Sequence, residues 1–193
     1  LEKLQKKYER KISNLDNQQT YLENEIERLE AEDKGVSKSY YEEQIKIEEL
    51  IKKHDGKIPF VRIELGTNLI GGQPVSLTNI RAVSEICHKN NILLMIDASL
   101  MTDNLYFNKV REDICQDMSI EEIALEISKC ADIIYFSARK LGSAKGGAIV
   151  LDDKALFDKM KILIPVYEGF LTYGGMSTRE MEAVAIGLEE ALD

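Results

Sequence analysis

Basic residues are the minority of the charged residues in this sequence of 193 amino acids. It holds 25 lysines and arginines against 34 aspartates and glutamates, which gives a formal net charge of -9 at pH 7. Proteins that bind nucleic-acid backbones or anionic membrane surfaces use clustered basic residues, so we expect neither kind of partner. Hydrophobic residues make up 44% of the sequence, which is enough for a globular domain to bury a core.

Cysteines and long apolar runs are also scarce. The three cysteines, Cys87, Cys115 and Cys130, lie far apart and form no C-x-x-C pair, so the sequence predicts neither a disulfide framework nor a metal site made of cysteines. We expect them to pack as small apolar residues. The longest clean apolar run, Ile92 to Ile96, is far shorter than the roughly 18 residues of a membrane span, and no signal-peptide pattern opens the chain. A cytoplasmic location without a membrane partner fits these features best.

Neither end of the sequence has the pattern of a natural terminus. The chain begins at Leu1 rather than at a methionine, and it stops within a predicted helix, Thr178 to Asp193. We therefore expect a fragment of a longer protein.

The first 35 residues differ in character from the rest. Residues 1–33 lack glycine and proline and carry a seven-residue apolar rhythm. Isoleucine at one seam position and leucine at the other favours a two-stranded parallel coiled coil. A heterodimer, a fold-back onto the next helix and a solvated helix that leads into the domain remain alternatives. We expect a coiled-coil-like helix over residues 1–35 and a second domain over residues 36–193. The seam residues are Leu1, Tyr8, Leu15, Leu22 and Leu29 on one position, with Ile12 and Ile26 on the other.

Apolar strands alternate with helices beyond residue 35. A strand, a helix and a second strand in succession indicate a parallel crossover connection, and Ser119 with Glu122 has the pattern of a capping box at a helix start. The sequence therefore predicts an α/β fold with a mostly parallel sheet flanked by helices. The predicted strands are Pro59–Leu65, Ile92–Ile96, Asp132–Phe136 and Gly147–Leu151, and the predicted helices are Tyr40–Lys53, Pro74–Lys89, Ser119–Lys129 and Lys154–Ile164.

Polar residues follow three of the predicted strands. In sheets of this kind, ligands bind outside the carboxyl ends of the strands. A carboxylate, an amine, hydroxyls and an amide are therefore expected to meet at one edge of the sheet. These residues are Thr67 and Asn68, Asp97 and Ser99, and Ser137 with Lys140.

Lys140 and Asp97 have the chemistry of a pyridoxal-phosphate site. Desolvation and repulsion from Arg139 would favour an uncharged Lys140 amine, which can form a Schiff base with a carbonyl cofactor. Pyridoxal phosphate also needs a carboxylate that keeps its ring nitrogen protonated, and Asp97 is placed to supply one. The alternative is a solvated lysine and an aspartate that caps a helix.

Several blocks of sequence resemble one enzyme family in order and in separation. From about Glu42 to the end, the chain is similar to the aromatic amino acid β-eliminating lyases, tyrosine phenol-lyase and tryptophanase. The resemblance implies that residues 36–193 are part of the large domain of a fold-type I pyridoxal-phosphate enzyme. It implies β-elimination on an amino acid substrate, in a homo-oligomer. The blocks are Gly66–Pro74, Asn104–Glu112, Ser137–Lys140, Tyr167–Gly169 and Thr172–Gly175.

The resemblance also implies a role for each candidate residue. Lys140 would carry the cofactor and transfer the proton at the substrate α-carbon, and Asp97 would pair with the ring nitrogen. Asn68 would donate a hydrogen bond to the ring oxygen, Ser137 would bind the phosphate, and Ser99 is a further cofactor-binding candidate. Phe170 would lie near the substrate pocket.

Three departures from the family pattern keep other functions open. The family has an arginine beside the cofactor ring oxygen where this chain has Leu100. Leu141 replaces a family aspartate, and Lys145 falls in the loop of the family's monovalent cation site, so cation dependence stays open. The family's phosphate-binding segment, expected before Glu42, and the C-terminal domain are missing. Alternatives are therefore transamination, aldol cleavage or γ-elimination with the same cofactor, or a non-catalytic assembly module with a vestigial site.

Overall fold

The computed structural model describes residues 46–54, 56–142, 144–167, 169–170 and 173–192. The chain divides into two units, Leu1–Glu49 and Leu50–Asp193, and nearly all described residues belong to the second. Residues 46–54 are helical. The coiled-coil-like helix over residues 1–35 lies outside the described residues, so that helix and the domain boundary after residue 35 stay predictions.

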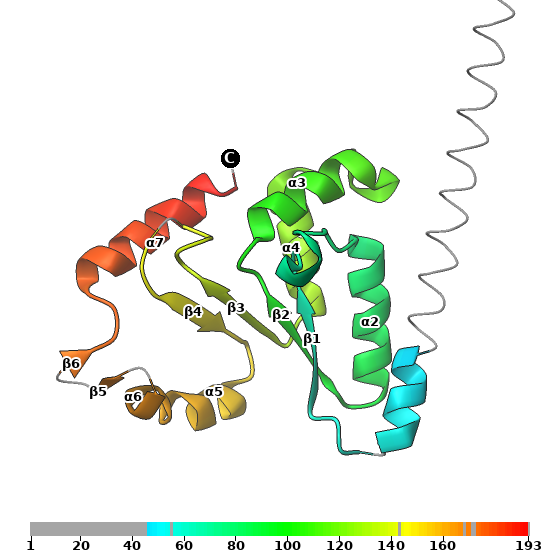
Figure 1. Cartoon of the computed structure of the whole chain (residues 1–193), viewed down its shortest axis with the longest axis horizontal. Coiled ribbons are helices and arrows are strands. Elements are labelled where there is room, and N and C mark those ends of the chain that lie inside the picture. The colour runs from blue at the N-terminus through cyan, green and yellow to red at the C-terminus, as the bar shows by residue number, and fades with distance from the viewer. Residues whose placement is uncertain (1–45, 55, 143, 168, 171–172, 193) are drawn as a thin grey trace, which may run out of the picture. The chain divides into compact units, whose positions relative to one another are not determined.

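Four strands form the central sheet of the second unit. Figure 1 shows them side by side in the order β1, β2, β3, β4. β1 pairs with β2 and β2 pairs with β3 in parallel, whereas β4 runs antiparallel to β3. The predicted α/β fold with a mostly parallel sheet is confirmed. The strands are β1 (Phe60–Glu64), β2 (Leu93–Asp97), β3 (Ile133–Ser137) and β4 (Gly147–Val150).

Helices connect the strands and follow the sheet. α2 packs against β1 and β2, and α4 packs against both α2 and α3. The Ser119 capping box predicted for the start of α4 is present in both directions. The sequence pattern did not predict α3. The helices are α2 (Leu77–Lys89), α3 (Met101–Arg111), α4 (Ile120–Cys130), α5 (Lys154–Lys161), α6 (Ile164–Tyr167) and α7 (Thr178–Glu190), with 3-10 turns η1 (Asn68–Ile70) and η2 (Asp113–Cys115) and a small hairpin of β5 (Gly169–Phe170) and β6 (Tyr173–Gly174).

The two faces of the sheet have different surroundings. Successive residues of a strand point to opposite faces, and in β2 Leu94 and Ile96 are fully buried while Met95 and Asp97 are half-buried. Burial of each such aliphatic side chain stabilises the fold by roughly 2 kcal/mol. The core therefore lies between the sheet and the layer that contains α2 and α4.

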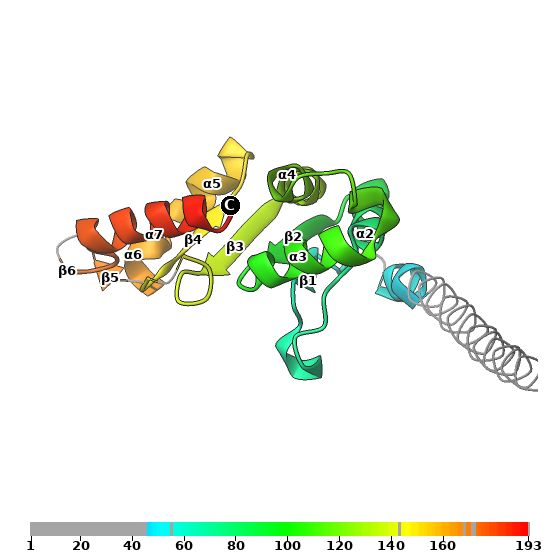
Figure 2. The ribbon, with the colours of Figure 1, turned by 90° about the horizontal axis from the view of Figure 1, so that it is seen from above.

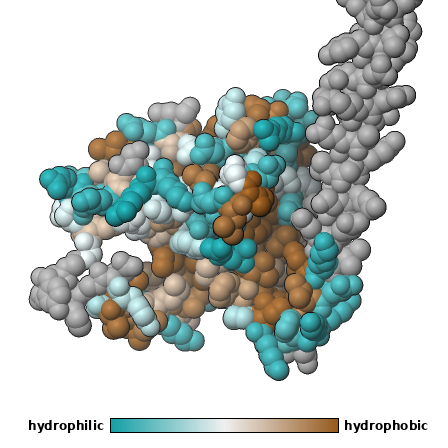
Figure 3. All heavy atoms as spheres, in the orientation of Figure 1, coloured by the Kyte–Doolittle hydropathy of each residue, from teal (hydrophilic) through white to brown (hydrophobic). Residues whose placement is uncertain are grey.

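The opposite face of the sheet carries the polar groups of the site. Phe60 on this face of β1 is 45% exposed, and none of the five residues of β1 is fully buried. Leu69 and Ile70 at the tip of η1 are 93% and 64% exposed. Figure 2 shows η1 projecting from the sheet on the side away from α4, and Figure 3 shows apolar side chains gathered over η1 and the region of β1 and β2.

A ladder of polar side chains on α3 holds the segment that leads from η1 into α2. The buried Asn104 side chain accepts a hydrogen bond from the Val75 amide at 2.8 Å and donates one to the Val75 carbonyl at 3.0 Å. Asn108, one helical turn on, donates to the same carbonyl at 3.0 Å. Glu112, a further turn on, accepts from the Leu77 amide at 2.7 Å at the start of α2. The spacing of four residues places Asn104 and Asn108 on one face of α3, and Glu112 follows directly after the last residue of the helix.

Among the described residues, no helix combines the length and the apolar character that a membrane crossing requires.

Candidate functional site

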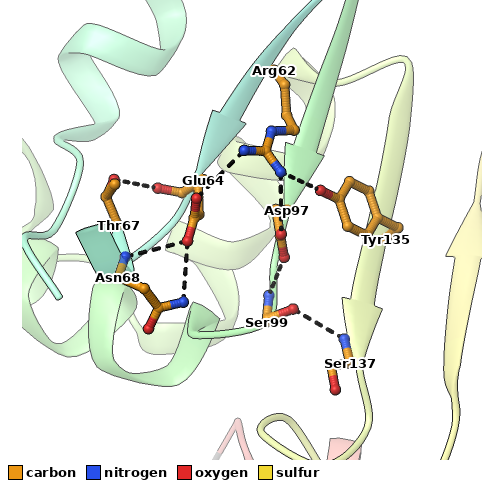
Figure 4. A network of polar contacts seen from close by, with 8 residues as sticks. All are labelled: Arg62, Glu64, Thr67, Asn68, Asp97, Ser99, Tyr135 and Ser137. Carbon is orange, nitrogen blue, oxygen red and sulfur yellow. Dashed lines mark hydrogen bonds and ion pairs between the residues drawn. The ribbon is translucent and has the colours of Figure 1, made fainter. Parts of the chain in front are cut away.

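Two neighbouring parallel strands end at the candidate site. Asp97 is the last residue of β2 and Ser137 the last residue of β3. Because parallel strands end at the same edge of a sheet, these two predicted residues lie close together. Ser99 joins them: its amide donates to Asp97 Oδ1 at 3.1 Å, and its Oγ accepts from the Ser137 amide at 3.0 Å (Figure 4).

The Asp97 carboxylate is held in its ionised form. Its side chain is only 15% exposed, and burial by itself would raise the pKa of this carboxyl. Hydrogen bonds from Ser99 and Tyr135 and the positive charge of Arg62 oppose that effect, so the pKa of Asp97 lies below its ordinary value of 3.8. Asp97 therefore carries a negative charge at neutral pH, as the partner of a protonated ring nitrogen must.

The sequence analysis missed three residues of this network, Arg62, Glu64 and Tyr135. Arg62 Nη1 donates to the Tyr135 hydroxyl at 3.0 Å and lies 3.9 Å from Asp97 Oδ2, and its Nη2 lies 3.5 Å from Glu64 Oε2 (Figure 4). Glu64 pairs in register with Asp97, and Asp97 with Tyr135, so all share one face of the sheet. Charged residues at alternate positions of a predicted strand were the available signal.

Asn68 lies in the turn after β1 and is bonded to Glu64. Its backbone amide and its Nδ2 donate to Glu64 Oε1 at 3.2 and 3.1 Å, while Thr67 Oγ1 donates to the Glu64 carbonyl at 3.0 Å (Figure 4). The Nδ2 group carries two N–H bonds and Glu64 uses one of them, so the predicted bond from Asn68 to a cofactor ring oxygen is compatible with the bond to Glu64.

Lys140 lies in the turn that follows β3. Its amide donates to the Ser137 carbonyl at 3.0 Å, and the next amide, of Leu141, donates to the same carbonyl at 3.1 Å. Leu141 is 5% exposed and anchors the turn. The Lys140 side chain is exposed, so the desolvated position expected from the sequence is not found in this structure.

α7 supports the Lys140 turn through two glycines. Gly142 has a φ of 92°, a conformation that other residues rarely adopt. A Cβ atom on Gly187 of α7 would lie 2.4 Å from the Gly142 Cα atom, so the helix and the turn approach each other at backbone distance. The position of the turn therefore depends on glycine at residue 187.

The remaining predicted residue, Phe170, lies in the β5–β6 hairpin, where its backbone pairs with Tyr173. Its side chain lies outside the described part of the structure, and its role in a substrate pocket stays a prediction. A cleft of about 940 Å³ is lined by residues of β3, β4, α5 and the start of α7. Ser137, Arg139 and Lys145 line this cleft, whereas Asp97 and Lys140 do not.

Comparison with known proteins assigns the chain to a family. The family model for beta-eliminating lyases matches residues 18–186. The chain belongs to the beta-eliminating lyase family. It is 42% identical to a tyrosine phenol-lyase of Lacrimispora saccharolytica over 138 residues, which cover 71% of this chain and 30% of that enzyme. It is 39% identical to a tryptophanase of Salinibacter ruber over 149 residues, which cover 77% of this chain and 32% of that enzyme.

Solved structures share the fold. A crystal structure provisionally described as an L-allo-threonine aldolase, from Listeria monocytogenes EGD-E, matches with a TM-score of 0.51 and 27% identity over 68% of this chain and 32% of that one. The chain thus spans about a third of the length of the relatives it matches. The family match begins at residue 18, inside the segment whose heptads predict a coiled coil.

Leu100, where the family resemblance implies an arginine, packs against the turn after β1. A Cβ atom on Gly66 would lie 2.8 Å from Leu100 Cβ, and Gly66 has a φ of 63°. Gly66 thus leaves room for Leu100 between the ends of β1 and β2. The substitution therefore puts an apolar contact at the edge of the sheet that carries the site.

Proposed function

We propose that this protein is a pyridoxal-phosphate-dependent lyase that acts on an amino acid by β-elimination, and that the described residues carry its lysine and aspartate. One observation supports this most directly: an ionised, mostly buried carboxylate, Asp97, lies at the sheet edge where the Lys140 turn begins, and Ser99 ties it to Ser137. Membership of the lyase family favours β-elimination over transamination, aldol cleavage or γ-elimination.

The residues at this edge fit the chemical groups of pyridoxal phosphate. The cofactor, when bound, supplies an aromatic ring that stores the electron pair released at the substrate α-carbon. Asp97 would hold the proton on the ring nitrogen, and Ser137 would donate to the phosphate. Lys140 would hold the cofactor covalently and would move the proton at the substrate α-carbon. Asn68 would donate to the ring oxygen through the second N–H bond of its Nδ2 group.

Further parts of the proposal concern the substrate, the oligomeric state, the location and a bound cation. The substrate is an amino acid and the active form is a homo-oligomer, as the family resemblance implies. The location is the cytoplasm, which the cysteine content of the sequence favours. A monovalent cation near the Lys145 loop is a separate proposal, which Leu141 in place of the family aspartate leaves open.

The test is an absorption titration of the purified chain with pyridoxal phosphate. We expect a visible band from lysine-bound cofactor, and we expect Lys140→Ala to lose it because the amine is gone. Lys129→Ala is the matched control, since this lysine is also exposed and pairs with Glu126 on α4, and its band should equal that of the wild type. Identical spectra for the wild type and Lys140→Ala would refute the proposal.

A further inference from the structure

Within the site network, Arg62 makes contacts that connect β1, β2 and β3. It lies on the face of the sheet opposite α2 and α4. It belongs to β1, and its guanidinium contacts the Tyr135 hydroxyl of β3 at 3.0 Å. Between those strands it lies 3.9 Å from the Asp97 carboxylate of β2. A planar guanidinium with several donors can serve two such partners at once, which an ammonium group does less well.

The surroundings of Arg62 keep it charged and in place. Its hydrogen bond with Tyr135, followed by the charges around it, raises the pKa of the guanidinium. Glu64, 3.5 Å away on the same strand, fixes the other end of the group, and Glu64 is itself held by Asn68. The Arg62 side chain is 49% exposed and that of Asp97 15% exposed. The cation thus approaches the buried carboxylate from the solvent side.

The two oxygen atoms of the Asp97 carboxylate therefore have different partners. Ser99 donates to Oδ1, whereas Arg62 lies nearest Oδ2. At 3.9 Å the ion pair is at the outer limit for direct pairing, so Arg62 attracts the carboxylate charge without enclosing it.

We propose that Arg62, braced by Tyr135 and Glu64, is a positioning residue for Asp97, and that it withdraws part of the Asp97 negative charge from the cofactor ring nitrogen. The second half rests on the proposed function, whereas the first half concerns the chain alone. Arg62 then sets how firmly the ring proton is held, although it does not touch the reacting atoms.

The direction of the effect follows from electrostatics. Removal of a nearby cation makes any neighbouring group hold its proton more tightly. In the described part of the chain, the charged and titratable groups that face Asp97 are Arg62 and Glu64 from β1 and Tyr135 from β3. Arg62→Met should therefore raise the pKa of Asp97, and should raise the pKa of a ring nitrogen bound beside it.

The first experiment uses the chain without cofactor. The carboxyl carbon of Asp97 is followed by NMR against pH in the wild type and variants. We expect Arg62→Met to increase its proton affinity roughly threefold, the order expected for a half-exposed ion pair, and Arg62→Lys to restore part of the difference. Tyr135→Phe should shift it in the same direction, because its hydroxyl also lowers the pKa of Asp97. Arg81→Met is the matched control: Arg81 is 46% exposed and pairs with Glu126 away from the site.

The second experiment adds pyridoxal phosphate labelled with nitrogen-15 in its ring. The ring-nitrogen shift should titrate at a higher pH in Arg62→Met, again by roughly a threefold change in proton affinity, and should be unchanged in Arg81→Met. An Asp97 titration that is identical in the wild type and Arg62→Met overturns the positioning role. A changed Asp97 with an unchanged ring nitrogen overturns the link to the cofactor. A changed Asp97 in a chain that binds no cofactor supports the positioning role and counts against the proposed function alone.

Discussion

The segment that leads from η1 into α2 depends most on Asn104. It is fully buried, and its side chain satisfies both the amide and the carbonyl of Val75. Buried backbone groups that lose their partner destabilise a protein by about 1 to 3 kcal/mol each. The Asn104 side chain thus stabilises a segment whose own backbone forms only short turns.

Asn104→Ala should lower the free energy of unfolding by about 2 to 4 kcal/mol, because it leaves the Val75 amide unpaired, leaves the Val75 carbonyl to Asn108 alone, and opens a cavity. Urea denaturation followed by circular dichroism measures this. Asn90→Ala is the control, because Asn90 is exposed and its side chain donates to the Ile86 carbonyl at the end of α2. An Asn104→Ala loss no larger than that of Asn90→Ala would show that Asn108 alone can hold Val75.

Leu100 allows a direct test of the substrate chemistry. Leu100→Arg introduces the guanidinium that the family resemblance implies at this position, and its stem can use the space beside Gly66. In a protein with the proposed activity, we expect it to increase β-elimination from tyrosine or tryptophan, measured as release of phenol or indole. Leu100→Met is the control without charge. No gain from the arginine would mean that the substrate class itself differs from that of the aromatic lyases.

A residue of the site could be predicted from the sequence only where its own position, after an apolar strand, indicated its place at the sheet edge. Asp97, Ser99 and Ser137 each follow an apolar strand, so the edge rule brought them together. Arg62 and Tyr135 are 73 positions apart and meet only through the strand register. The exposure of Lys140 was likewise missed, because burial depends on the whole surface around a turn.

At the scale of helices and strands, apolar periodicity and capping motifs explain which elements could be predicted from the sequence. The helix at Ile120–Cys130 combines a capping box with an apolar face, and it was found with nearly correct bounds. The buried face of α3, in contrast, includes the polar residues Asn104 and Asn108. The sequence of α3 therefore lacks the apolar periodicity that identifies a helix. The antiparallel direction of β4 was also not predicted, since strand direction is set by the path of the chain and not by the strand itself.

A substitution in α7 tests whether this helix packs against the Lys140 turn, because the answer decides whether the change raises or lowers the stability. A glycine-to-alanine change inside a helix ordinarily stabilises it by roughly 1 kcal/mol. Gly187→Ala should instead destabilise by about 1 to 3 kcal/mol, because the new Cβ would meet the Gly142 backbone. It should also weaken the visible band of lysine-bound cofactor, since the Lys140 turn must move. Thermal unfolding and the absorption titration measure the two effects.

The control for this helix is Ala185→Gly, at an exposed position two residues away. It should lower stability by roughly 1 kcal/mol through helix propensity alone and leave the cofactor band intact. If Gly187→Ala stabilises the protein, α7 and the Lys140 turn do not pack at backbone distance in solution.

At the scale of the whole molecule, one apolar layer unites the helices with the sheet. Cys87 of α2, Cys115 of η2 and Cys130 of α4 are all buried in it, as the sequence predicted. Burial raises the pKa of all three thiols, that of Cys87 to about 11. Because the thiolate is the reactive form, roughly one Cys87 in a thousand is reactive at pH 8.

This layer should open as one unit when the protein unfolds. α4 packs against both α2 and α3, so loss of any one helix exposes the faces of the others. We expect the three thiols to be inert toward a disulfide reagent in the native state and to become reactive at the same urea concentration, measured by mass spectrometry of the labelled peptides. If Cys115 reacted at lower urea than Cys87 and Cys130, α3 and η2 would open by themselves. The Asn104 ladder would then release the segment with Asn68 before the sheet and its Asp97 unfold, and the two halves of the candidate site would differ in stability.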